Sequence, residues 1–266
     1  MKNRFLLRIV LLFLAIFTSN RNVIGRVDNM PNPCVTHSFY LNQAADLVYL
    51  DCYAPSLMTS ARYATNENLT GIPLDGYFAE RVAIKLPVAK ALLEVNEELR
   101  PLGYQLVIYD GYRPQRAVRH FVNWQKLPED SHENKMKYYP NLEKSDLFCL
   151  GYISEHSVHC TGYAVDLTLI KLGENLRAPV VRESTLSDGQ KISVIDDGTI
   201  DMGTSFDFMH EASNPASELV SEEQFANRII LKKVMLRHNF EPIAEEWWHF
   251  NYKNRHSTDA YDFPIR

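Results

Sequence analysis

Apolar residues recur at helical spacing in one stretch of the first half of the chain, and a helix-start signal marks a second stretch. Residues 87–99 carry them every three or four positions, with Pro87 suited to a first turn and Gly103 following as a stop signal. Residues 114–125 form the second stretch, and Pro114 again suits the first turn. Both stretches are predicted to be helices.

A third helix is predicted where a polar start precedes an apolar repeat. Ser221 is followed three residues later by Gln224, a capping-box pattern, and apolar residues then recur on a helical period as far as Met235. This is the clearest helix signal in the chain.

Strands are predicted where aromatic and β-branched residues alternate or cluster. Residues 104–109 alternate and form one such segment, which delivers Arg113 just beyond its end. The segment 245–250 is dense in aromatic residues and also favours a strand. Between residues 169 and 206 lies a polar, glycine-containing stretch with β-prone pieces such as 191–195, which is typical of an inserted hairpin.

The order of these elements decides the fold class. Helices and strands do not alternate regularly enough for a parallel α/β fold, and the proline-interrupted stretch before residue 76 favours loops. We therefore predict an α+β fold with a mostly antiparallel sheet packed with helices. A length of 266 residues supports one substantial core, so residues 26–266 are expected to form a single domain.

The first residues have a different character. Lys2 and Arg4 precede an apolar run over residues 9–17 that is too short to span a bilayer comfortably, which predicts a secretory signal over residues 1–25. The mature protein is then expected in the periplasm or outside a bacterial cell. Arg8 intrudes on the apolar stretch, so an uncleaved anchor remains the alternative. No stable membrane partner is expected, because no later segment resembles a membrane span.

Composition excludes some classes of partner. The hydrophobic fraction of 45% and the charged fraction of 23% are ordinary for a globular protein, and the net charge is −5. A nucleic-acid partner is not expected, because the chain lacks a concentrated basic face.

Four cysteines form an even set, which in an exported protein permits two disulfides in three connectivities. Sequence proximity favours Cys34 with Cys52 and Cys149 with Cys160. Unpaired buried thiols are the alternative.

Candidate chemistry first appears in residues 157–166, which read Ser-Val-His-Cys-Thr-Gly-Tyr-Ala-Val-Asp. His159 and Asp166 are seven positions apart, so on one continuous strand they would face opposite sides of the sheet. Gly162 supplies the permissive backbone for a turn between them. Such a turn lets the imidazole and the carboxylate converge on one point.

A second candidate segment, residues 245–250, reads Glu-Glu-Trp-Trp-His-Phe. If His249 faces the same point from a strand, Glu246 lies at its bent entrance, close to a metal without binding it. Two imidazoles and one carboxylate suit a catalytic zinc site, in which the ion lowers the pKa of a water molecule to about 7. Glu246 is then the candidate base, and Arg113 is the cation placed to stabilise an oxyanion.

Each of these residues alone has an ordinary structural interpretation, such as a turn cap for Asp166 or a helix-end contact for Arg113. Their conjunction favours the catalytic one. A zinc-stabilised binding module would need the ligands but neither the base nor the cation. A hydrolase built on Ser157 or Cys160 is disfavoured because no nucleophile elbow surrounds either residue.

These two segments resemble the zinc signatures of the D-alanyl-D-alanine dipeptidases, the VanX type. The resemblance runs from Arg62 to the C-terminus. Further matching segments are residues 62–65, 68–71, 110–118, 202–203, 206–209 and 261–264.

The resemblance implies a Hedgehog/DD-peptidase-like fold with the zinc site on the sheet. It implies one zinc ion per chain with His159, Asp166 and His249 as ligands. It also implies Glu246 as general base and Arg113 as the group that stabilises the transition state.

The substrate implied by the resemblance is the dipeptide D-Ala-D-Ala, hydrolysed to free D-alanine in cell-wall peptide turnover or in depletion of wall precursors. Asp207 is expected to bind its free amino group, a natural task for a carboxylate, and Ser157 is expected to line the substrate pocket. The alternative is a D,D-carboxypeptidase or L,D-peptidase acting on longer wall peptides. The stretch 170–205 looks longer than the family usually has, which leaves substrate breadth open. A homodimer also stays open, since no dimer motif is evident.

Overall fold

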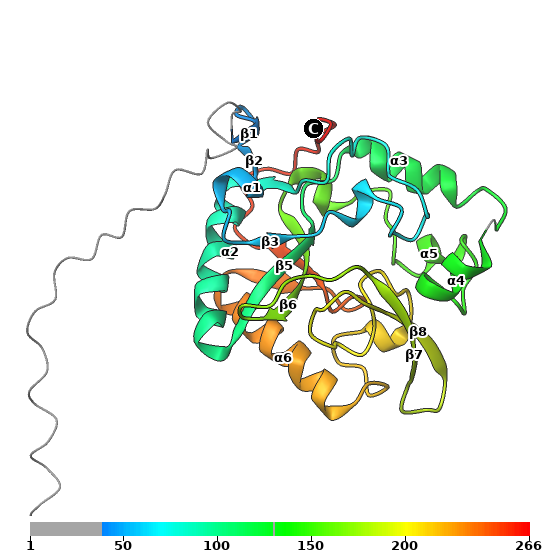
Figure 1. The fold of residues 1–266 in the computed structure, drawn as a ribbon. Helices are drawn as coiled ribbons and strands as arrows, with labels where there is room; N and C mark the ends of the chain where they lie inside the picture. The colour runs from blue at the N-terminus through cyan, green and yellow to red at the C-terminus, as the bar shows by residue number, and fades with distance from the viewer. Residues whose placement is uncertain (1–38, 130) are drawn as a thin grey trace, which may run out of the picture.

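The computed structural model describes residues 39–129 and 131–266 and shows a mixture of helices and sheets (Figure 1). A five-stranded sheet occupies its centre, in the order β3-β5-β6-β10-β9. Its strands are β3 (Met58–Thr59), β5 (Tyr104–Asp110), β6 (Ala164–Lys171), β10 (His249–Tyr252) and β9 (Phe240–Pro242). β3 runs parallel to β5, and the other neighbouring pairs of this sheet are antiparallel.

The two longest strands, β5 and β6, form the middle of the molecule. Nearly every residue of β6 and the last five residues of β5 are buried, which requires that both faces of the sheet are covered. The predicted strand 104–109 is therefore present and extends one residue further, to Asp110. A register shift between Ile108 and Asp110 bends this end of β5.

Two long helices cover the sheet. α2 (Leu86–Leu99) packs against β5, α6 (Glu222–Arg237) packs against β9, and the two helices contact each other. Both were predicted from apolar periodicity, and both halves of the predicted capping box at Ser221 are formed. In Figure 1, α2 lies on one side of the sheet, whereas α4 and α5 lie on the other.

The helix predicted over residues 114–125 is also present. α3 (Gln115–Trp124) starts one residue after Pro114, which occupies the N-cap position. Two short helices, α4 (His132–Tyr138) and α5 (Asp146–Cys149), were not predicted. α4 carries few apolar residues and α5 is only four residues long, so neither gives a clear helical period.

The N-terminal stretch contains more regular structure than its prolines indicate. β1 (Tyr40–Asn42), β2 (Leu47–Tyr49) and β4 (Ala83–Lys85) form a three-stranded sheet, and α1 (Leu50–Tyr53) follows β2. This sheet supports a turn of the candidate site, because the Lys85 backbone N–H donates to the Gly162 carbonyl at 3.1 Å.

The hairpin expected between residues 169 and 206 is present as β7 (Val180–Thr185) paired with β8 (Lys191–Asp196). It is attached to the rest of the protein just after β8, where Asp197 is buried. Its carboxylate accepts hydrogen bonds from the Arg62 guanidinium and from the Tyr109 hydroxyl at 2.9 Å. β8 also contacts α4.

The structure differs from the prediction for residues 245–250, since only His249 and Phe250 are in a strand. Trp247 is held in a turn by tertiary contacts: its backbone N–H donates to the Ser213 carbonyl and its indole N–H to the Thr204 hydroxyl. The aromatic residues of this segment indicated that its two tryptophans are buried, and they did not indicate an extended backbone.

The predicted signal, residues 1–25, lies outside the described residues. Within residues 39–129 and 131–266, no helix combines the length and apolar character needed to cross a membrane.

Candidate metal centre and active site

Two side chains of the site come from neighbouring strands. Asp166 of β6 and His249 of β10 are direct partners in the antiparallel ladder, so both side chains leave the sheet on the same face. Asp166 Oδ1 lies 3.1 Å from His249 Nδ1, and both residues are buried. The sheet register itself therefore brings these two groups together.

The third side chain arrives through a turn. His159 lies in a short 3₁₀ helix, η4 (Val158–Thr161), and Gly162 follows with φ of 77°. A side chain at Gly162 would place its Cβ 2.7 Å from Leu47, so glycine is required here for both its backbone conformation and its size. The predicted turn returns the chain so that His159 Nε2 lies 3.3 Å from Asp166 Oδ2.

The three groups form a compact donor set, with their ligand atoms all within 4.8 Å of one another. His159 Nε2 and His249 Nδ1 are 3.1 Å apart. Two imidazole nitrogens with one carboxylate, leaving room for a further ligand, is the donor set that catalytic zinc sites use.

A hydrogen bond on the outer side of each imidazole determines which of its two nitrogens carries the proton. His159 Nδ1 lies 2.7 Å from the Gly111 carbonyl, and His249 Nε2 lies 3.2 Å from Asn251 Oδ1. Both partners accept, so we assign the protons to those outer nitrogens. The inner nitrogens then turn unprotonated lone pairs toward each other and toward a carboxylate. This arrangement fits a bound cation, which would satisfy all three groups at once.

The electrostatics of Asp166 agree with a metal-binding carboxylate. Burial raises its pKa, but when the imidazoles are protonated and no ion is bound, the charge of His159 and hydrogen bonds from His159 and His249 outweigh burial and hold the pKa well below its usual value. The group is therefore ionised across the physiological range.

Arg113 lies beside this donor set. Its guanidinium contacts Asp110 Oδ2 at 2.9 Å and Asp166 Oδ2 at 3.3 Å, and it lies over the ring of Tyr63. Asp110 is fixed in turn by the Tyr77 hydroxyl at 2.7 Å. The cation predicted at the end of β5 thus points into the site.

Glu246 occupies the turn before β10. Its Oε2 lies 3.9 Å from His249 Nδ1, which is near the donor set but beyond hydrogen-bonding distance. Burial raises its pKa well above the usual value, and the charges of Asp166 and Asp207 raise it further. Glu246 is therefore a carboxyl group beside the donor set that can exchange a proton.

Asp207 is a second buried carboxyl group, on a backbone with φ of 61°. The Tyr63 hydroxyl donates to its Oδ2 at 2.8 Å. Burial, followed by the charge of Asp166, raises its pKa to about 8. Such a carboxylate gains strongly from a cationic partner.

All seven predicted site residues line one cavity of about 180 Å³, and these are Arg113, Ser157, His159, Asp166, Asp207, Glu246 and His249. Ser157 contributes its hydroxyl, which accepts from the His159 backbone N–H at 3.3 Å. Four supporting residues were not predicted as site residues: Tyr63, Tyr77, Asp110 and Asn251. Asn251 left a usable signal, because positions two apart on a strand share a face with each other.

The predicted disulfide between Cys149 and Cys160 is wrong, because both thiols are free. Cys149 is exposed on α5 whereas Cys160 is buried in η4, so nearness in sequence did not bring them together. Burial raises the pKa of Cys160 to about 11, which does not suit a nucleophile. Cys52 is disulfide-bonded, and its predicted partner Cys34 lies outside the described residues.

Comparison with known proteins gives a consistent picture. The peptidase M15 family, described as D-ala-D-ala dipeptidase, matches residues 43–178 and 174–264. The D-alanyl-D-alanine dipeptidase of Enterococcus faecium is 34% identical over 219 residues, which cover 82% of this chain and 97% of that protein. The enzymes of the same name from Enterococcus faecalis and Escherichia coli are 35% and 28% identical, over 80% and 79% of this chain and 95% and 86% of their own lengths.

A solved structure of a mutant of the vancomycin-resistance D,D-pentapeptidase VanY in complex with Zn(II) matches 68% of this chain and 78% of its own. Its sequence identity is 12% and its TM-score is 0.31, values too low to carry an argument.

Proposed function

Because the chain belongs to the D-Ala-D-Ala dipeptidase family of M15 metallopeptidases, we propose that it hydrolyses D-Ala-D-Ala to two molecules of D-alanine with one zinc ion per chain. His159, Asp166 and His249 would hold the ion. The observation that carries this proposal is the set of two inward-facing imidazole lone pairs and one ionised carboxylate within 4.8 Å. Zinc bound there supplies Lewis acidity to a carbonyl oxygen and lowers the pKa of water.

The surrounding residues divide the remaining work of the proposed reaction. Glu246 takes a proton from the attacking water as its oxygen bonds to the peptide carbonyl carbon. The same carboxyl group then gives the proton to the amine as the C–N bond breaks. Arg113 stabilises the negative charge that develops on the carbonyl oxygen. Its bonds to Asp110 and Asp166 hold it in place before substrate arrives.

Substrate length is set by Asp207, which lines the same cavity as the groups above. Asp207 accepts hydrogen bonds from the ammonium group of the dipeptide, whose charge favours the ionised carboxylate. Ser157 lines the same cavity. The cavity of about 180 Å³ lies below the roughly 300–1,000 Å³ of pockets for drug-sized ligands, which supports a dipeptide over a longer wall peptide.

Location and role follow as part of the same proposal. Residues 1–25 act as an export signal, and residues 26–266 form one catalytic domain in the periplasm or outside the cell. The domain is of the Hedgehog/DD-peptidase type, with its zinc centre on a mostly antiparallel sheet. The reaction serves wall-peptide turnover or depletion of wall precursors.

The test is a comparison of three substrates with the zinc-loaded protein: D-Ala-D-Ala, its N-acetyl derivative and a wall pentapeptide ending in D-Ala-D-Ala. We expect rapid release of D-alanine from the free dipeptide only. Equal rates on the N-acetyl derivative would remove the role given to Asp207. Faster cleavage of the pentapeptide would identify a D,D-carboxypeptidase instead.

A further inference from the structure

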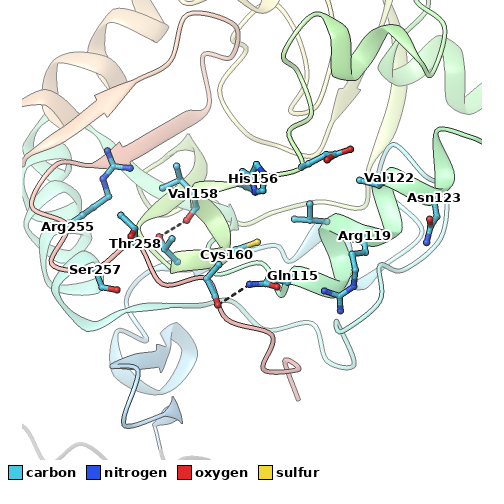
Figure 2. Close-up of a pocket in the computed structure, with 15 residues that line it drawn as sticks. Gln115, Arg119, Val122, Asn123, His156, Val158, Cys160, Arg255, Ser257 and Thr258 are labelled. Carbon is cyan, nitrogen blue, oxygen red and sulfur yellow. Dashed lines mark hydrogen bonds between the residues drawn. The ribbon is translucent and has the colours of Figure 1, made fainter.

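A second and larger pocket lies beside the candidate active site (Figure 2). Its volume is about 780 Å³, within the roughly 300–1,000 Å³ typical of small-molecule sites. It lies between α3, the segment 155–161 and the C-terminal residues 255–260. Residues 156–158 line both this pocket and the smaller cavity.

The lining of this pocket combines an apolar surface with charged groups. Val118 and Val122 of α3 and Val158 of η4 supply apolar surface. Arg119 and Arg255 lie at opposite sides of the pocket, one on α3 and one on the C-terminal segment (Figure 2). An apolar pocket with a few charged groups is the usual composition of a ligand site.

Each arginine pairs with an acidic residue that does not itself line the pocket. Arg119 Nη2 contacts Asp262 Oδ2 at 2.9 Å, and Arg255 Nη2 lies 3.6 Å from Glu241 Oε1. A guanidinium has five N–H donors, so one such contact leaves donors for a carboxylate in the pocket. Glu155 also lines the pocket and contributes one negative charge.

We propose that this pocket binds a short peptide acid that carries two carboxylates, one ammonium group and small apolar side chains. The carboxylates pair with Arg119 and Arg255, the ammonium group pairs with Glu155, and methyl side chains rest on the valines. The charge pattern excludes D-Ala-D-Ala as the preferred ligand, because that dipeptide has a single carboxylate. The site does not depend on hydrolysis in the neighbouring cavity and is occupied at the same time as that cavity.

Isothermal titration calorimetry tests this site directly. The full-length Glu246→Gln protein is titrated with the tripeptide Ala-Glu-Ala, with free termini, in the presence of saturating D-Ala-D-Ala. We expect one tripeptide to bind per chain, and the Ala-Gln-Ala peptide with an amidated C-terminus to bind at least tenfold more weakly. Absence of tripeptide binding, or displacement of the tripeptide by the dipeptide, would overturn the proposal.

Substitutions in the pocket locate the binding. The double variant Arg119→Gln/Arg255→Gln should lower tripeptide affinity at least tenfold, and Val122→Phe should lower it by filling the pocket. Arg182→Gln, on the exposed strand β7, is the matched control and should bind normally. Unchanged affinity in both pocket variants would refute the site. Hydrolysis of D-Ala-D-Ala by the unsubstituted protein is measured separately and decides the proposed reaction.

Discussion

The site combines groups carried by strands with groups carried by turns, and the two sets are held in different ways. Asp166 and His249 are fixed by the register of β6 and β10. Arg113 also contacts Asp166, and Asn251 contacts the outer nitrogen of His249. Glu246 and Asp207 lie in turns, where burial raises the pKa of each carboxyl group. The paired strands fix two of the three ligands that a shared ion requires, and the turn of η4 adds His159. The turns at Glu246 and Asp207 instead place ionisable groups that change their protonation during a reaction.

The largest effect is expected when the proton-exchanging group is removed from its turn. Glu246→Gln keeps the size of the side chain and should lower kcat by on the order of 10²–10⁴-fold, the usual contribution of a general base. Zinc content should stay the same, because Glu246 is not in the donor set. Glu245→Gln is the matched control and should retain activity. Normal turnover by the Glu246 variant would exclude this base.

A smaller effect is expected from the strand side. Asn251→Ala removes the acceptor that holds His249 Nε2–H, so the ring is less firmly oriented. Zinc affinity should fall by about 10–100-fold, as for other residues that orient metal ligands. Competition with a chelator measures this, with Asn123→Ala on the surface of α3 as the control. Equal affinities would show that the strand alone orients the imidazole.

The smallest effect concerns pH. The pKa of Asp207 is about 8, so the carboxyl group is mostly protonated below that pH and must ionise to bind the substrate ammonium group. The value of kcat/KM should therefore rise with pH, by roughly two- to threefold between pH 7 and 8, because the gain from ionising Asp207 is partly offset as the amine of the substrate loses its proton near pH 8. Above that pH the value should fall. Asp207→Asn should flatten the rising limb. An unchanged profile in this variant would assign the limb to another group.

Much of this arrangement was predictable from local patterns. The helices α2, α3 and α6 and the strand β5 follow from apolar spacing and helix-start signals, and Gly162 marked the turn that brings His159 to Asp166. These features depend on residues that are close in sequence, so a local sequence pattern is enough to predict them.

What could not be predicted depends on tertiary contacts. The turn at Trp247 is held by Ser213 and Thr204, which lie more than thirty positions away. The free state of Cys149 and Cys160 depends on where two separate elements pack, not on their separation of eleven positions in the sequence. The pairing of Asp110 with Arg113 likewise needs the bend at the end of β5.

The central claim is that His159, Asp166 and His249 share one zinc ion that dipeptide hydrolysis requires. The most direct measurement determines zinc content by elemental analysis and D-alanine release from D-Ala-D-Ala on the same samples of the unsubstituted protein and of Asp166→Ala. We predict one zinc per chain and two D-alanines per dipeptide for the former, and loss of both in the variant. Hydrolysis by zinc-free protein, or full zinc content in Asp166→Ala, would contradict the account.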